Sequence, residues 1–107
     1  TGFGASFYLS DEPRLTDAEV ESASLKMEHG HAVIRVLLTP EGGEMLASMT
    51  RDNIGRPLAI MVDSKVVAAP IISSEIQDGI VAINGNFSSR EAARIALKIV
   101  GGVAPSQ

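Results

Sequence analysis

The hydrophobic positions of this chain fall into short runs, and the two strongest runs lie in its middle. Residues 58–62 and 66–72 are apolar at nearly every position, which is typical of strands that are buried on both faces. The linker Asp63-Ser64-Lys65 is short enough for a hairpin. We therefore expect these runs to form the central strands of a sheet, with Pro70 at an edge or a bulge because proline donates no ladder hydrogen bond.

The segment after residue 38 has the signals of a first helix. Thr39 can cap this helix, and Pro40 is tolerated in the first turn, where no backbone donor is lost. Gly55 favours the left-handed conformation that follows many helices, so the helix is expected to stop there, before Pro57. Three apolar residues share one face of this helix and are expected in the core: Met45, Leu46 and Met49.

A second helix is indicated near the end of the chain. Ser88 and Glu91 form a capping box, in which a hydroxyl and a carboxylate each satisfy a backbone donor. The helix is expected to lie along the sheet and to end at Gly101-Gly102, and residues 103–107 are interpreted as a tail or linker. Its apolar stripe has helical spacing: Ala92, Ile95, Ala96, Ile99 and Val100.

Shorter elements complete the pattern. Thr16 and Glu19 form another capping box and predict a short helix or turn over about residues 17–22. Three further features are expected: an edge strand over residues 3–9, a hairpin of residues 24–28 and 32–38 around His29-Gly30-His31, and a short strand over residues 80–83 between the turns Asp78-Gly79 and Asn84-Gly85.

The sum of these elements predicts an α+β fold, with a mainly antiparallel sheet connected by hairpins and two principal helices packed on it. The chain has 107 residues, so we expect one domain over residues 1–107. The 45% of hydrophobic residues indicate a globular chain, and three Phe, one Tyr and no Trp leave aliphatic side chains to fill its core.

Charge and composition exclude several function classes. The net charge of −4 and nine scattered Lys and Arg residues argue against a nucleic-acid surface, because phosphate binding needs clustered cations. The absence of cysteine excludes disulfides and thiolate metal sites. The apolar runs are far shorter than the roughly 20 residues of a membrane helix. Because Thr1 opens the chain with no basic or apolar leader, we expect an excised or processed segment, with any signal or membrane span outside it.

The candidates for chemistry are weak. His29 and His31 could begin a metal site, but a solvated turn is the favoured interpretation. Gly42-Gly43 lacks the Lys-Ser or Lys-Thr of a phosphate loop, and no Gly-x-Ser-x-Gly elbow occurs. We therefore predict no catalytic residue, no metal, no cofactor and no enzyme activity. An acidic run lacks calcium-loop spacing and is interpreted as a solvated face: Asp11, Glu12, Asp17, Glu19 and Glu21.

The methionines allow two interpretations. Thioether side chains repack around varied partners, so the four methionines could form an adaptable peptide-binding surface. Their spacing and surroundings favour core positions for three of them: Met45, Met49 and Met61.

Ordered motifs give the chain a family resemblance. The run from Thr50 to Ala59, TRDNIGRPLA, is followed by residues 58–72 in the pattern LAIMVDSKVVAAPII. With the other motifs it resembles the head subdomain of the periplasmic domain of SecD protein-export subunits over nearly the whole chain. Ser64 and Ala68 stand where that family commonly has Gly and Ser, which affects the turn type rather than the fold. The other motifs are Leu15-Thr16, Val33 through Glu41-Gly42-Gly43, and Gly79, Ile83, Gly85, Phe87 and Glu91-Ala92.

This resemblance implies a part of a membrane machine. The parent protein would be an accessory subunit of the Sec translocon, driven by the proton-motive force and embedded in the cell membrane, with proton-relay residues outside this chain. Its head would lie in the periplasm and engage the unfolded translocating polypeptide, while the parent meets the translocon channel and a partner subunit. The polypeptide is expected to contact the exposed face of residues 66–72: Val66, Val67, Ala69, Ile71 and Ile72.

Two other classes stay open at this stage. A free-standing envelope protein or lipoprotein could use the same head fold as an interaction module. A small hydrolase or metal enzyme would rest on His29, His31 and the acidic run alone.

Overall fold

The structure, a computed structural model, describes residues 5–9, 12–85 and 87–100. The first half of the chain forms β1 (Ala5–Leu9), β2 (Glu12–Leu15), the 3-10 turn η1 (Asp17–Glu19), β3 (Val20–Glu28), β4 (His31–Leu38) and helix α1 (Pro40–Arg51). The second half forms β5 (Leu58–Val62), β6 (Lys65–Ala68), β7 (Ile80–Asn84) and helix α2 (Ser89–Val100).

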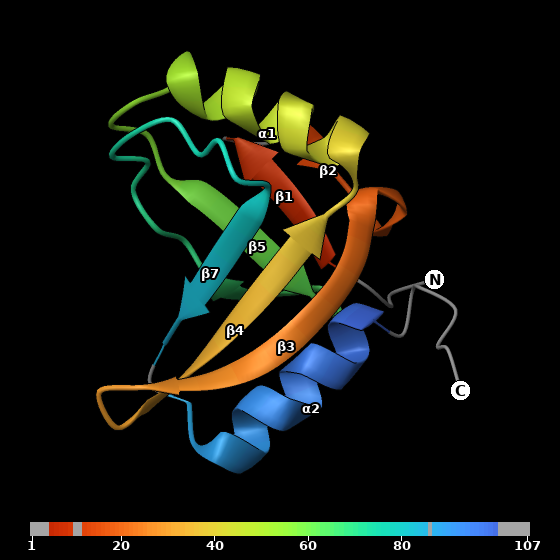
Figure 1. Ribbon diagram of the computed structural model, residues 1–107, viewed down its shortest axis with the longest axis vertical. Helices are drawn as coiled ribbons and strands as arrows, with labels where there is room; N and C mark the ends of the chain where they lie inside the picture. Colours follow the sequence, from red (N-terminus) through yellow and green to blue (C-terminus); the bar gives the residue numbers. More distant parts are fainter. Residues whose placement is uncertain (1–4, 10–11, 86, 101–107) are drawn as a thin grey trace.

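The strands form two antiparallel sheets. The first sheet has the order β2-β1-β5-β6 and the second has the order β3-β4-β7. Helix α2 runs along β3 and β4, and α1 lies across one end of the molecule (Figure 1). The α+β class with antiparallel strands and two packed helices is confirmed. The strands are divided between two sheets because β5 pairs with β1, whereas β7 pairs with β4.

One hydrophobic cluster joins both sheets and both helices. Phe7 and Ile60 enter it from the first sheet, and Ile34 enters it from the second, each fully buried. Leu46 of α1 and Ile99 of α2 close its ends. Burying each such side chain stabilises the fold by roughly 1.5–3 kcal/mol relative to leaving it exposed.

The two predicted hairpin turns, which depend on only a few neighbouring residues, are present in the structure. The hairpin between β3 and β4 turns at His29 and Gly30, whose φ angles are 53° and 80°. The hairpin between β5 and β6 has φ angles of 56° at Asp63 and 64° at Ser64, the pattern of a type I′ turn. Ser64 therefore occupies a left-handed position that glycine adopts at lower cost.

The capping boxes are confirmed at both predicted positions. The Ser88 hydroxyl accepts from the Glu91 N–H at 3.1 Å, and the Glu91 carboxylate accepts from the Ser88 N–H at 3.0 Å. Thr16 and Glu19 make the same reciprocal pair at η1. In α2 the predicted stripe faces the core, with Ala92 fully buried. The predicted ending at Gly101-Gly102, the tail over 103–107 and the side chain of Val100 lie outside what the structure describes.

Two predictions about element boundaries were wrong. The short helix or turn predicted over 17–22 is present, but it ends at Glu19, because Val20 is already extended and begins β3. Helix α1 ends at Arg51, four residues before Gly55, which instead has a φ of 90° in the turn that follows.

Two strand positions were also wrong. The strand predicted at an edge, β1, lies between β2 and β5, because the polar segment Glu12–Leu15 pairs along its other side. The second predicted central strand is the edge strand β6, and it ends at Ala68.

Met45 is 46% exposed and is not a core residue, whereas Leu46 and Met49 are buried.

Candidate functional site

The predicted contact surface is split between the solvent and the core. Val66 and Ile71 are 59% and 60% exposed, and Ala69 is exposed beside them. Val67 is half-buried and packs against the core, whereas Ile72 is only 5% exposed and belongs to it. The side chain of Ile72 is therefore not available at the surface. The uniform apolar run concealed this difference, because the chain leaves the sheet after Ala68 and turns Ile72 inward.

The segment from residue 69 to residue 79 is fixed to the body of the fold at several points. Pro70 O accepts from Leu58 N–H at 2.8 Å, and Ile72 N–H donates to Arg56 O at 2.9 Å. The Thr50 hydroxyl, from α1, accepts the N–H of Ile76 at 3.0 Å. This irregular segment is held in place by bonds to two other parts of the chain, so it can form a fixed wall.

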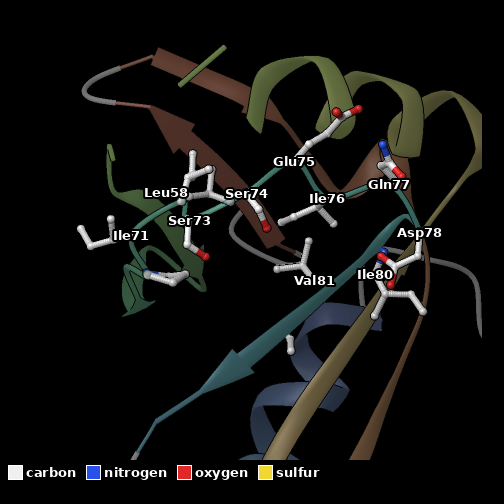
Figure 2. Close-up of a pocket in the computed structure, with 13 residues that line it drawn as sticks. Leu58, Ile71, Ser73, Ser74, Glu75, Ile76, Gln77, Asp78, Ile80 and Val81 are labelled. Carbon is white, nitrogen blue, oxygen red and sulfur yellow. The ribbon is translucent and has the colours of Figure 1, made fainter. Parts of the chain in front are cut away.

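A groove lies between this segment and β7. Its volume is about 590 Å³. Figure 2 shows that the backbone of residues 71–78 and β7 meet near Asp78 and diverge from there, with the side chains of Ile76 and Val81 directed into the space between them. We call it the β7 groove; it is lined by Leu58, residues 70–78 and residues 80–82.

The β7 groove combines an apolar interior with a polar, acidic rim. Leu58, Ile72 and Val81 are buried and apolar, while Ser73, Ser74 and Gln77 supply hydroxyl and amide groups. Two carboxylates, Glu75 and Asp78, belong to its lining, and no lysine or arginine does. The Glu75 carboxylate lies 3.7 Å from the guanidinium of Arg51 and forms an ion pair with it. The Asp78 carboxylate accepts from the N–H of Ile80 at 3.0 Å. The sequence predictions missed this groove, because its two walls meet only in the folded chain.

The other predicted candidates do not converge on a reactive centre. His29 lies in the exposed turn between β3 and β4, and His31 is the exposed first residue of β4. Glu12 pairs with Arg14 at 3.2 Å, and Glu19 is part of the η1 capping box. Within residues 5–9, 12–85 and 87–100, no three His, Asp or Glu side chains are placed to share a metal ion. Neither α1 nor α2 is long and apolar enough to cross a membrane.

The fold and this site define an α+β domain built from two antiparallel sheets, with an apolar groove beside an open strand edge. A sequence model of the SecDF P1 head subdomain matches residues 3–105. The chain therefore belongs to the SecDF P1 head subdomain family, and the resemblance found in its motifs is confirmed.

Individual relatives agree with this assignment. SecD of Elusimicrobium minutum is 34% identical over 106 residues, which cover 96% of this chain and 22% of that protein. A solved structure of SecDF, described as a membrane component that enhances protein export, has a TM-score of 0.77 and 37% identity over 82% of this chain and 40% of that one. SecDF of Thermus thermophilus, described as a translocon-associated membrane protein, has a TM-score of 0.68 and 37% identity over 87% of this chain and 13% of that one. The chain thus spans about a fifth of its curated SecD relative.

Proposed function

We propose that this chain forms one domain, the periplasmic head of a Sec translocon accessory subunit, and that it engages the translocating polypeptide during export driven by the proton-motive force. The observation that carries the proposal is the family match over residues 3–105. Membrane helices and proton-relay residues then belong to other parts of the parent protein, which holds the head outside the membrane near the translocon channel.

The surface chemistry supports contact with an unfolded chain. An unfolded polypeptide exposes apolar side chains, and exposed apolar residues on a folded domain mark sites where such chains can bind. Val66 and Ile71 are each more than half exposed, and Ile71 also lines the β7 groove. A head of this kind acts mechanically, because holding a segment outside the membrane hinders its return through the channel.

The experiment is photo-crosslinking in the full-length parent protein. A photoreactive side chain is placed at Val66 or Ile71 in membrane vesicles that carry a stalled, translocating polypeptide. We expect capture of that polypeptide at both positions. The matched control is Glu21, an exposed residue of the acidic segment on β3.

Capture at Glu21 equal to that at Val66 and Ile71 would defeat the choice of surface. The parent open reading frame gives an independent check, since membrane helices and a further periplasmic domain are expected in it. A lipoprotein signal just upstream and a stop codon near Gln107 would instead identify the free-standing envelope module.

A further inference from the structure

The backbone of β7 offers hydrogen-bonding groups on the side facing away from β4. Leu38 N–H donates to Gly79 O at 2.9 Å, and Val36 lies opposite Val81 in the same antiparallel register. Antiparallel pairs alternate between hydrogen-bonded and non-hydrogen-bonded positions. The backbone N–H and C=O of Val81 therefore point toward β4, whereas those of Ala82 point away from it. β7 is the end strand of its sheet, so the N–H and C=O of Ala82 face the groove side without a ladder partner in the described residues.

This edge lacks the protection that the other sheet edges have. Edge strands commonly carry charges or proline, which discourage pairing with a further strand. Among the described strands, β2 contains Pro13, β6 contains Lys65, and β3 contains Lys26 between two glutamates. The sequence of β7, IVAIN, contains neither a charge nor a proline.

The β7 groove adds space and a fixed second wall to this edge. Ala82 is exposed and lines the groove, while the side chain of Val81 forms part of its interior. The opposite wall, residues 70–78, is held by the hydrogen bonds of Ile72 and Ile76 described above. A preformed wall lowers the entropy lost when a segment binds.

We propose that an extended polypeptide segment binds in the β7 groove as an added antiparallel or parallel strand, pairing its main chain with the outward-facing N–H and C=O of Ala82. This inference rests on the proposed function and specifies how the head holds its substrate. Main-chain pairing suits a translocation subunit, because main-chain groups are common to all polypeptides. The head can therefore bind an extended segment with little dependence on its sequence.

The lining also determines which segments bind best. Alternate side chains of an added strand point to opposite faces, so every second one enters the apolar space between Leu58, Ile76 and Val81. The rim contributes Glu75 and Asp78 and no cation, and Asp78 takes part in none of the ion pairs among the described residues. The favoured occupant is therefore an extended segment with apolar residues at alternate positions and a lysine or arginine near Asp78.

Cysteine scanning tests the strand geometry directly. The chain contains no cysteine, so Ala82→Cys introduces one defined thiol into the head. It is placed in the full-length parent, and the stalled polypeptide carries single cysteines at successive positions of an unfolded apolar segment. We expect the disulfide yield to alternate with a period of two residues, because only every second side chain lies on the face of Ala82. Uniform yields along the segment would overturn the proposal.

Two substitutions at the same position separate the main chain from the side chain. Ala82→Pro removes the outward N–H and should abolish capture by a photoreactive group at Ile71, whereas Ala82→Val keeps the N–H and should preserve it. Protection of the β4 amides from hydrogen exchange reports whether each variant is folded. If a folded Ala82→Pro variant captures as the original protein does, strand addition is wrong; if it does not fold, the cysteine periodicity alone decides.

The charge preference has its own test. Asp78→Asn keeps an oxygen that can accept from the N–H of Ile80 but removes the negative charge. Capture of a lysine-bearing segment should fall, while capture of the matched segment with glutamine in place of lysine should not. Equal capture of both segments by both proteins would overturn the predicted preference.

The outcomes also separate this inference from the proposed function. Capture at Val66 and Ile71 without periodicity at Ala82 overturns strand addition and leaves the polypeptide-binding role intact. Absence of capture at all of these positions overturns both.

Discussion

Thr50 is the single buried polar side chain among the described residues, and it connects α1 to the groove wall. Its hydroxyl donates to Leu46 O at 2.7 Å and accepts from the N–H of Ile76 at 3.0 Å. One hydroxyl therefore satisfies a backbone donor 26 positions away in the sequence. This residue positions the wall of the β7 groove without lining it.

Replacement of Thr50 by valine should destabilise the domain. Thr50→Val keeps the shape of the side chain but leaves the N–H of Ile76 without its acceptor, which costs about 1–3 kcal/mol in the free energy of unfolding. Thr50→Ser is the matched control, because it retains the oxygen and loses only a methyl group. Urea unfolding measures both, and a Thr50→Val domain as stable as the original would show that this bond contributes little.

Gly42 lies where α1 meets η1, and a side chain there has no room. A Cβ at Gly42 would lie 2.8 Å from Glu19 Cβ and 3.1 Å from Glu19 O, and Glu19 O also accepts from Thr39 N–H at 2.8 Å. Glu19 and Gly42 are 23 positions apart, so the sequence alone did not predict this close approach. Close packing against Glu19 is the physical reason for glycine at this position.

The two neighbouring glycines should respond differently to alanine. An exposed alanine in a helix is favoured over glycine by roughly 1 kcal/mol, but Gly42→Ala should lower stability because Glu19 must move. Gly43→Ala is the control, since its Cβ would come no closer than 3.4 Å to Gly79 Cα. Thermal unfolding compares the two, and a stabilised Gly42→Ala variant would contradict the close packing.

At the scale of elements, an ion pair connects the β5–β6 hairpin to α2. Lys98 Nζ lies 2.9 Å from Asp63 Oδ2, and both side chains are partly exposed. The hydrogen bond and the charge of Lys98 lower the pKa of Asp63 below its ordinary value of 3.8, with a smaller contribution from Lys65. The pair holds the last turns of α2 against a turn that precedes the edge strand β6.

The contribution of this pair should depend on pH in a defined direction. Because folding lowers the pKa of Asp63, the stabilisation is present above about pH 4 and is lost as the pH falls through the folded pKa. Lys98→Met should therefore cause a small loss of stability at pH 7 that disappears in acid and shrinks at high salt.

The control for the ion pair lies on the same helix. Arg94 is exposed and takes part in none of the ion pairs among the described residues, so Arg94→Met should show no such pH dependence. Measuring both variants by denaturant unfolding from pH 3 to pH 7 provides the comparison. A Lys98→Met effect that is constant across this range would rule out the pair as its cause.

At the scale of the whole molecule, one core joins the two sheets. Phe7 of β1 is fully buried and lies in the same hydrophobic cluster as Ile34 and Ile83 of the second sheet. Because the sheets share this core, neither can lose its packing independently of the other. We expect the described fold to unfold in one cooperative transition.

Removal of the Phe7 ring tests this cooperativity. Phe7→Ala should lower the free energy of unfolding by about 3–5 kcal/mol, the usual cost of the lost burial plus the cavity. Tyr8→Ala is the control, because Tyr8 is the next residue and is only half-buried. Hydrogen exchange should show reduced protection in β4 as well as β1. Loss confined to β1 would mean that the sheets unfold separately.

The strongest local patterns predicted much of the fold. The two capping boxes, the turn at Gly30 and the strand at residues 58–62 all depend on interactions within a few residues, and all were confirmed. Predictions failed where a distant partner decides the outcome. β1 is internal because the polar strand β2 pairs with it. Met45 is exposed because it lies at the margin of the buried face of α1, which is formed by Gly42, Leu46, Met49 and Thr50.

The candidate site was only partly accessible from the sequence. The apolar run at residues 66–72 indicated a contact surface, but identical residue types gave no means to distinguish the exposed Ile71 from the buried Ile72. The β7 groove gave no sequence signal, since Leu58, Ile76 and Val81 are separated by intervening segments.

The sequence by itself determined the α+β class, the caps, the turns and the family of this protein, because each depends on residue types at short spacing or on their order along the chain. The tertiary structure alone decided how the strands are divided between two sheets, which edges are open, and how residues 70–78 lie opposite β7. The physical reason is that pairing and burial at long range depend on which surfaces meet when the chain folds. The apolar run at residues 58–72 shows both contributions: its pattern predicted two strands, and only the folded structure shows that the second of them, β6, lies at a sheet edge beside β7.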